Sequence, residues 1–450
     1  MNNKKTFRFV IPGALIFVYA VVLFLIFNLE RTIDFTPFYI SIKALSLGFN
    51  PYPLSKTLPA NLNPPIFLYV FYPLGFFEYR TAIIIWSLIS ISLGFIGIRL
   101  MFMHIFSEKF RQKYGLSLYC IYFGFFPILM DISIVQVGSL LLFAVMLGYH
   151  YYLRQNDYIA GICWGFIISL KLFPALLFFF MLKQRRYKVF FITLGVFLCA
   201  LLIPLLFHGP TIYKQYLTMM SVIYWYGDSW NASIYGYIFR LYLDLKHPGQ
   251  NVVPVYIGYL ISFAILLPCY LYAMGPKEIR GEKNQVNYQP FCLTLAMMIF
   301  LSPFGWLYYF PLIVFPLMLT GIATFNRNYK TLIPLIAWTA CFLLLNFPQG
   351  YILGRQMQNF TQKIGLYSFS FYGLAILVIL VCCKRNLPGQ NEPNISLMLQ
   401  NEDKRRFLLI NLASLAFGIA APLNSFLIRL SMGGAGSYNL KDLYPLLGQS

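Results

Sequence analysis

The chain has 450 residues, of which 59% are hydrophobic, 19% aromatic and 11% charged, with a mean hydropathy of +0.68 and a formal net charge of +20. Soluble domains are about 45–50% apolar and about 25% charged, so the composition excludes that class and indicates a polytopic membrane protein. Repeated apolar runs of about 20 residues, without alternation of polar and apolar positions, favour a helical bundle over a membrane barrel.

The excess of positive charge suggests nucleic acid at first sight, but its distribution indicates membrane topology instead. Lys and Arg gather in short segments between apolar runs, and such segments face the cytoplasm under the positive-inside rule. These segments are residues 4–8, 109–113, 183–188 and 277–283. We therefore predict a cytoplasmic N-terminus and no nucleic-acid partner.

The first elements in chain order are a spanning helix and a long outer segment. Residues 9–27 are apolar enough to span, and no small-residue cleavage site of a signal peptide follows them. Residues 30–80 then emerge on the outer face, where residues 38–47 and 65–77 are expected as short interfacial helices. Residues 81–103 return to the cytoplasm.

Three later apolar runs contain residues that predict a break into two helices. The runs are residues 115–153, interrupted by Pro127 and Asp131; residues 158–182, interrupted by Lys171 and Pro174; and residues 291–325, interrupted by Ser302 and Pro303. Each break is expected to make a turn toward the outer face. Continuous spans are predicted over residues 189–207, 253–272, 331–345 and 366–383, with a weaker one over residues 407–427.

The predicted architecture is all-α, a polytopic transmembrane helical bundle of roughly eleven to thirteen spans. Its domains are a bundle over residues 1–385, a cytoplasmic linker over residues 386–406, and a C-terminal helix and tail over residues 407–450. Outer loops are expected over residues 29–80, 208–251 and 348–365. The eight cysteines fall in apolar runs without paired spacing, so we predict packing roles for them and no metal site or cofactor.

Among the outer carboxylates, Asp34 and Asp228 have the surroundings of a site. Asp34 follows the first span, in a segment too rich in Pro, Tyr and Asn to cross the membrane and too apolar to be a free linker. Partial burial at the lipid–water boundary would favour a carboxylate that accepts a proton near neutral pH, which suits a general base. The alternative is that Asp34 caps a helix starting near Pro37.

The cations also have two interpretations each. Lys171 is either an anion-binding residue or a lysine that extends its ammonium toward the interface. Arg240 and Lys214 are candidates for holding a lipid phosphate, or else interfacial anchors. The aromatic segment over residues 224–239 is either an interfacial belt or a surface on which sugars stack.

An ordered set of short motifs runs through residues 8–325. The set comprises Asp34 followed by Tyr39, Gly48 to Tyr52, Pro64-Pro65, Gln136 within residues 135–138, Ala160-Gly161 leading to Lys171 and Pro174, Asn231 and Ser233 leading to Arg240, and Ser302-Pro303 leading to Trp306 and Tyr308. In this order the motifs resemble the GT-C superfamily of membrane glycosyltransferases, specifically its polyprenol-phosphate-mannose-dependent mannosyltransferase family. Two departures are visible: Tyr308 stands where that family usually has His, and residues 135–138 read VQVG, without the family's leading Gly and its Asn.

The resemblance implies a hexosyltransferase, and the sugar it implies is mannose. Such enzymes move a sugar from a polyprenyl-phosphate donor to a lipid- or glycan-linked acceptor on the outer face of the bacterial inner (plasma) membrane, with inversion and as part of cell-envelope glycan synthesis. It assigns Asp34 as the catalytic base. The substrate-binding residues it implies are Tyr39, Tyr52, Gln136, Lys171, Asn231, Ser233, Arg240, Trp306 and Tyr308.

Two other functions remain open at this point. A transporter or flippase for lipid-linked glycans would show internal repeats and paired broken helices, and only Lys171 and Pro174 offer such a feature. A non-catalytic membrane assembly factor would need neither Asp34 nor a sugar site. The chain has no P-loop and no Gly-rich dinucleotide motif.

Overall fold

The structure is a computed structural model in which apolar runs become helices. It describes residues 3–28, 34–53, 60–223, 225–243, 251–275, 286–325, 333–352, 360–383, 387, 416 and 418–428. Within these ranges it contains helices and isolated β-bridges but no strand. The predicted all-α class is thereby confirmed.

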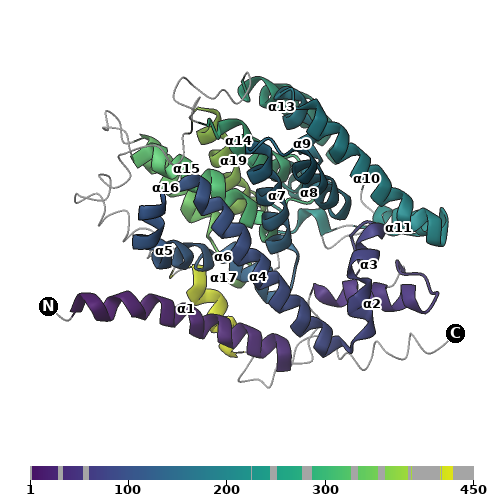
Figure 1. Ribbon diagram of the computed structural model, residues 1–450, viewed down its shortest axis with the longest axis horizontal. Helices are drawn as coiled ribbons and strands as arrows, with labels where there is room; N and C mark the ends of the chain where they lie inside the picture. The colour runs from purple at the N-terminus through teal and green to yellow at the C-terminus, as the bar shows by residue number, and fades with distance from the viewer. Residues whose placement is uncertain are drawn as a thin grey trace.

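The first half of the chain forms ten α-helices and two 3-10 helices (Figure 1). They are α1 (Asn3–Asn28), α2 (Phe35–Ser46), α3 (Pro65–Phe71), η1 (Tyr72–Phe76), α4 (Tyr79–Ile105), α5 (Glu108–Phe123), α6 (Phe126–Ser133), α7 (Gly138–Leu153), α8 (Asp157–Leu170), η2 (Phe173–Ala175), α9 (Leu176–Lys183) and α10 (Tyr187–His208). The helices predicted inside the outer segment, near residues 38–47 and 65–77, are present as α2 and as α3 with η1.

The second half of the chain also consists of α-helices and short 3-10 helices. Its elements are α11 (Thr211–Ser221), η3 (Trp225–Gly227), α12 (Ile234–Tyr242), α13 (Val253–Ala273), α14 (Gln289–Phe300), η4 (Leu307–Ile313), α15 (Val314–Phe325), α16 (Ile333–Leu345), α17 (Gln349–Ile352), α18 (Phe360–Ile364), η5 (Leu366–Ser368) and α19 (Phe369–Cys382). A further helix, Gly418–Ile428, lies near the C-terminus.

Five helices of the described residues are long and apolar enough to cross a membrane, or six if the bent pair of α5 and α6 is one span. The chain is therefore a multi-pass membrane protein. Eight shorter apolar helices of 10–17 residues accompany them. The predicted eleven to thirteen spans stay a prediction, because interrupted runs yield helices that are too short to cross alone.

All three predicted interruptions are present. Residues 134–137 separate α6 from α7, Lys171 and Leu172 separate α8 from η2, and residues 301–306 separate α14 from η4. Gly124 and Phe125 also separate α5 from α6. Pro127 stands in the first turn of α6 and Pro174 in the first turn of η2, each directly after a break. Proline has no N–H to donate, so this is the helical position it tolerates best.

Small residues let the central helices approach closely. A Cβ added at Gly165 of α8 would lie 2.7 Å from Thr193 O of α10, and one at Gly97 of α4 would lie 3.0 Å from Phe143 N of α7. Such contacts replace the hydrophobic effect as the packing force between helices in lipid. In Figure 1, α7 and α8 lie in the centre, while α10 and α13 run along the rim. Only 17% and 11% of the apolar windows of α10 and α13 are buried, as expected for lipid-facing helices.

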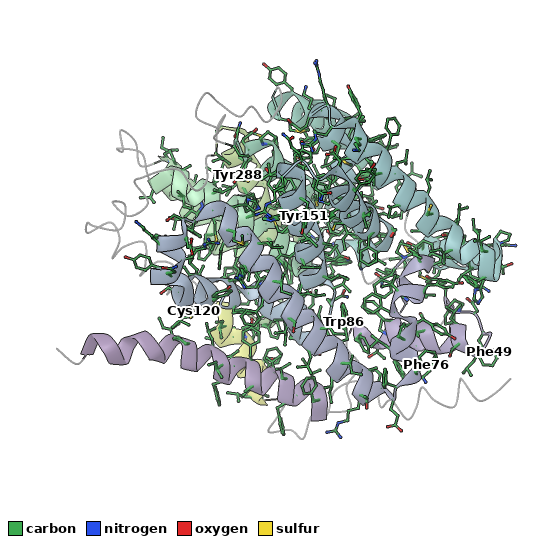
Figure 2. All side chains as sticks on the ribbon, viewed as in Figure 1. Phe49, Phe76, Trp86, Cys120, Tyr151 and Tyr288 are labelled. Carbon is green, nitrogen blue, oxygen red and sulfur yellow. The ribbon has the colours of Figure 1, made fainter. Side chains whose placement is uncertain are left out.

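The outer segment carries exposed aromatic residues at its edge. Figure 2 shows Phe49 and Phe76 at the periphery of the α2–η1 region, and their exposed fractions are 39% and 74%. Exposed large apolar side chains on or beside such short helices are typical of contact with a lipid interface. The interfacial location remains a prediction that this arrangement supports.

The C-terminal helix packs against the first one. Val18, Val22 and Leu25 of α1 form one buried cluster with Leu129 and Phe426, and the yellow helix lies beside α1 in Figure 1. The predicted span over residues 407–427 is described only at residue 416 and from residue 418 onward. Apart from Leu387, the predicted linker over residues 386–406 lies outside the described residues, as does the tail after residue 428.

Candidate active site

Asp34 meets a loop that lies 102 positions further along the chain. Gln136 Nε2 donates a hydrogen bond to Asp34 Oδ2 at 2.9 Å. Asp34 immediately precedes α2, but its side chain makes no capping hydrogen bond to that helix. The capping alternative therefore finds no support, and the contact with Gln136 places the Asp34 carboxylate against the break between α6 and α7.

The loop that carries Gln136 is held by Asp131. The carboxylate of Asp131 is fully buried and accepts hydrogen bonds from Gly138 N at 2.7 Å, Ser139 N at 2.9 Å and Ser139 Oγ at 2.8 Å. It thereby satisfies backbone donors in the first turn of α7 that have no partner within the helix. The four-residue break between α6 and α7 is thus closed into a compact turn, from which the buried Gln136 side chain reaches Asp34.

Val135 adopts a left-handed backbone conformation in this turn, with φ at +57°. For a β-branched residue this conformation costs on the order of 1–3 kcal/mol and persists only where surrounding contacts impose it. Val135 is also the position at which the motif of the resembled family carries Gly, the residue that adopts positive φ without strain. Val135 therefore holds this turn at a conformational cost that a glycine would not incur.

Lys171 completes a charged group with Asp34. It follows the last residue of α8, is only 9% exposed, and its Nζ lies 5.3 Å from the centroid of the Tyr309 ring. The charge of Asp34 acts on Lys171, Tyr308 and Tyr309. The carboxylate, the ammonium and the two phenols therefore form one electrostatic neighbourhood, although they come from three separate segments.

The segment after α14 supplies the aromatic wall of this neighbourhood. Trp306 and Tyr308 stack with centroids 6.3 Å apart, and Tyr308 contacts Tyr309 edge to face at 4.7 Å. Phe173, just beyond Lys171, stacks on Tyr309 at 4.5 Å. Tyr308 also brings its carbonyl oxygen against Gly138, where a Cβ would lie only 2.1 Å away.

Asn231 joins the aromatic wall to the segment that contains η3 and the start of α12. Its Nδ2 donates to Tyr226 O and Pro303 O, both at 2.8 Å, and its Oδ1 accepts from Ser233 N at 3.1 Å and Gly305 N at 3.0 Å. An antiparallel bridge between Asn231 and Trp306 runs alongside these contacts. Because both ends of the amide are occupied within the protein, its visible role is to hold two loops together.

Ser233 and Arg240 extend the same scaffold. Ser233 Oγ accepts from Gly236 N and caps α12. Arg240 donates from Nη1 to Asp228 O and Asn231 O, both at 2.9 Å, and from Nε to Ser368 Oγ at 3.1 Å. Its Nη2 has no partner among the described residues. Burial lowers the pKa of Arg240 to about 10, against the opposing effect of the Asp228 charge, so the guanidinium remains positive at neutral pH.

Tyr39 and Tyr52 hold the outer segment to its surroundings. The Tyr39 hydroxyl donates to Phe77 O at 2.8 Å, which ties α2 to the start of α4. The Tyr52 hydroxyl donates to Asn63 O at 2.9 Å. The structure thus brings Gln136, Lys171 and Tyr308 to Asp34. It connects four further predicted residues to this group through the aromatic wall: Trp306, Asn231, Ser233 and Arg240. Tyr39 and Tyr52 instead make hydrogen bonds within residues 34–80.

Two residues of this neighbourhood were not predicted as part of a site. Asp131 was considered as an interruption of an apolar run. No sequence pattern predicts that its carboxylate accepts hydrogen bonds from residues 138 and 139. Tyr309 follows Tyr308 directly, and the pair of adjacent tyrosines was the available signal. Within the described residues, no group of three or more His, Cys, Asp or Glu side chains is arranged to hold a metal ion.

The model of glycosyltransferase family 87 matches residues 61–303, more than half of the chain. The chain belongs to glycosyltransferase family 87. Gln136, Lys171, Asn231, Ser233 and Arg240 lie within the family match, whereas Asp34, Trp306 and Tyr308 lie outside it. No curated protein and no solved structure matches the chain. Membership makes this multi-pass membrane protein a glycosyltransferase, as the resemblance found in the sequence implied.

Proposed function

We propose that the chain transfers a hexose, with mannose as the first candidate, from a polyprenyl-phosphate donor to an acceptor hydroxyl on a lipid or glycan. The observation that carries this proposal is the assembly of Asp34, Gln136 and Lys171, a hydrogen-bonded carboxylate within electrostatic range of a buried cation. Family membership supports the transferase over the flippase and the assembly factor.

The proposed chemistry is a single displacement at the anomeric carbon. Asp34 takes the proton of the acceptor hydroxyl while the hydroxyl oxygen forms a bond to that carbon from the face opposite the phosphate. The bond between the anomeric carbon and the phosphate oxygen breaks, and its electron pair leaves on the polyprenyl phosphate. The configuration at the anomeric carbon is inverted in this step.

Gln136 and Lys171 have separate tasks in this scheme. Gln136 holds Oδ2 of Asp34, so the carboxylate is oriented before the acceptor arrives. Lys171 stabilises the negative charge that grows on the departing phosphate, and its burial makes this interaction stronger than it would be in water. Tyr309, whose ring lies beside the ammonium, keeps Lys171 in place through a cation–π contact.

The topology predicted from the basic segments supports an outer-face location for this chemistry. Residues 34, 136 and 171 each lie at a turn predicted to face outward, and the structure gathers all three turns at one site. A donor embedded in the outer leaflet by its polyprenyl chain would present its phosphate at that level. The inner (plasma) membrane of bacteria is the expected location.

The experiment that tests this function measures transfer of radiolabelled sugar by the purified protein in lipid nanodiscs. Polyprenyl-phosphate mannose, other polyprenyl-phosphate hexoses and the corresponding nucleotide sugars are supplied in parallel with a membrane-lipid extract as acceptor. We expect label in the lipid or glycan fraction only with polyprenyl-phosphate donors. Transfer from nucleotide sugars alone would overturn the assigned donor class.

Replacing Lys171 by methionine should lower turnover about a hundredfold, because the departing phosphate loses its cation while the side-chain volume is kept. The measurement is the rate of sugar transfer at saturating donor. Lys183→Met serves as control, since Lys183 is exposed at the other end of the same broken run. Equal rates for both variants would show that Lys171 does not assist the leaving group.

A further inference from the structure

Two asparagines next to the site leave a donor and an acceptor unused. Asn61 and Asn63 are 3% and 1% exposed. Asn61 Oδ1 accepts from Asn63 N at 3.1 Å and from Asn63 Nδ2 at 2.7 Å. Asn61 Nδ2 and Asn63 Oδ1 remain without a partner among the described residues. Buried polar groups in native proteins are almost always paired, so an unpaired donor and acceptor in one short segment need an explanation.

This amide pair, Asn61 with Asn63, is connected to the site through tyrosines. The Tyr216 hydroxyl donates to Leu62 O at 3.4 Å, and the Tyr216 ring meets Tyr52 edge to face at 5.3 Å. Tyr216 also lies within electrostatic range of Tyr309, the residue beside Lys171. The segment leads directly into α3, which packs against α8, the helix that ends at Lys171. The amide pair is therefore linked to the residues of the proposed reaction through Tyr216 and through the packing of α3 on α8.

We propose that the amide pair binds one hydroxyl of a sugar ring, an inference that rests on the proposed function. A hydroxyl donates one hydrogen bond and accepts others, so one hydroxyl satisfies both free groups by accepting from Asn61 Nδ2 and donating to Asn63 Oδ1. The sugar is either the hexose of the donor or the terminal residue of a glycan acceptor. Asn61 and Asn63 are then specificity-determining residues that the motif set did not include.

The chain offers a substitution that removes the free donor, keeps the bonded acceptor and adds a negative charge. Asn61→Asp keeps the oxygen that accepts from Asn63 and replaces Nδ2 by a second oxygen of nearly the same size. Asn50→Asp is the control, because Asn50 is exposed in the same outer segment and its Oδ1 accepts from Tyr52 N at 2.9 Å. We expect Asn61→Asp to lower kcat/KM about ten- to a hundredfold, with a melting temperature lowered by the buried charge, and the exposed Asn50→Asp to have little effect on either.

Deoxy-sugars separate recognition from a purely structural role. Polyprenyl-phosphate mannoses and glycan acceptors are prepared that each lack one ring hydroxyl. One analogue should cost the wild type about as much as Asn61→Asp does, and the same analogue should cost the Asn61→Asp variant little more. If that analogue is a donor, the hydroxyl belongs to the donor; if it is an acceptor, the hydroxyl belongs to the acceptor.

Additive losses with every analogue would overturn the inference, because the amide pair would then be filled by water or serve only the turn. Failure of the proposed function gives a different result, in which the wild type transfers no sugar from any donor. In that case the affinities of the wild type and Asn61→Asp for methyl mannoside and its deoxy analogues are compared, with tryptophan fluorescence as the measure of binding. A hydroxyl-specific loss of affinity in Asn61→Asp supports the amide pair, and its absence overturns the inference.

Discussion

Asp34→Asn should reduce turnover by about a hundred- to ten-thousandfold while leaving donor binding intact. The asparagine oxygen can still accept the hydrogen bond from Gln136, so the geometry of the site is kept and only the capacity to take a proton is lost. The measurements are the rate of sugar transfer from polyprenyl-phosphate mannose and the affinity for that donor.

The matched control is Glu78→Gln, which removes a carboxylate from an exposed position at the other end of the same outer segment. This variant should transfer sugar at the wild-type rate. Normal transfer by Asp34→Asn would remove Asp34 from the reaction and leave the family membership untouched, because the family match begins at residue 61. A loss of both turnover and donor binding would instead indicate a role in binding.

Gly138→Ala should destabilise the protein by about 1–3 kcal/mol and abolish transfer, because the new Cβ has no room. It would lie 2.1 Å from Tyr308 O and 2.6 Å from Asp131 Oδ1, and the first of these is a backbone atom that cannot swing aside. Relief would require the break between α6 and α7 to open, which moves Gln136 away from Asp34. Melting temperature and transfer rate measure the two effects.

Gly195→Ala in α10 is the control for this substitution. A Cβ there meets nothing within 4 Å, and alanine in a helix interior is favoured over glycine by about 0.5–1 kcal/mol. The control should therefore match or slightly exceed the wild-type melting temperature. Equal melting temperatures for Gly138→Ala and Gly195→Ala would show that the close approach between Tyr308 and α7 is not required by the fold.

The helices could be predicted because lipid imposes a simple rule on the sequence. Every spanning segment must be apolar and must satisfy its own backbone, so apolar runs and their prolines give helices and breaks directly. Pro127 and Pro174 indicated two breaks, and both are present. The number of spans could not be predicted in the same way. It depends on the angle between successive short helices, such as the 64° bend between α5 and α6, which no local pattern encodes.

The site was predicted only as a set of separate residues. The contact between Gln136 and Asp34 joins residues on either side of several helices, and no periodicity relates them. Substrate binding by Asn231 stays a prediction, and the structure adds that its amide donor and acceptor hydrogen-bond the loops around it. The sequence shows which residue types are present, whereas the fold decides whether their polar atoms remain available.

The arrangement of helix breaks determines which residues of such a protein can change when its sugar or acceptor changes. Asp34, the Gln136 turn, Lys171 and the segment before η4 all stand where an apolar run stops. Within the hydrocarbon layer, backbone groups left unpaired at a helix break must find partners inside the protein. Breaks in different helices can pair with one another, and we therefore expect them to lie at the same depth in the membrane. That shared depth is the one layer of the bundle that accepts polar substitutions, while the halves above and below it must stay apolar. Changes of sugar or acceptor among related chains should therefore accumulate in a thin slab of residues that is scattered along the sequence and continuous in space.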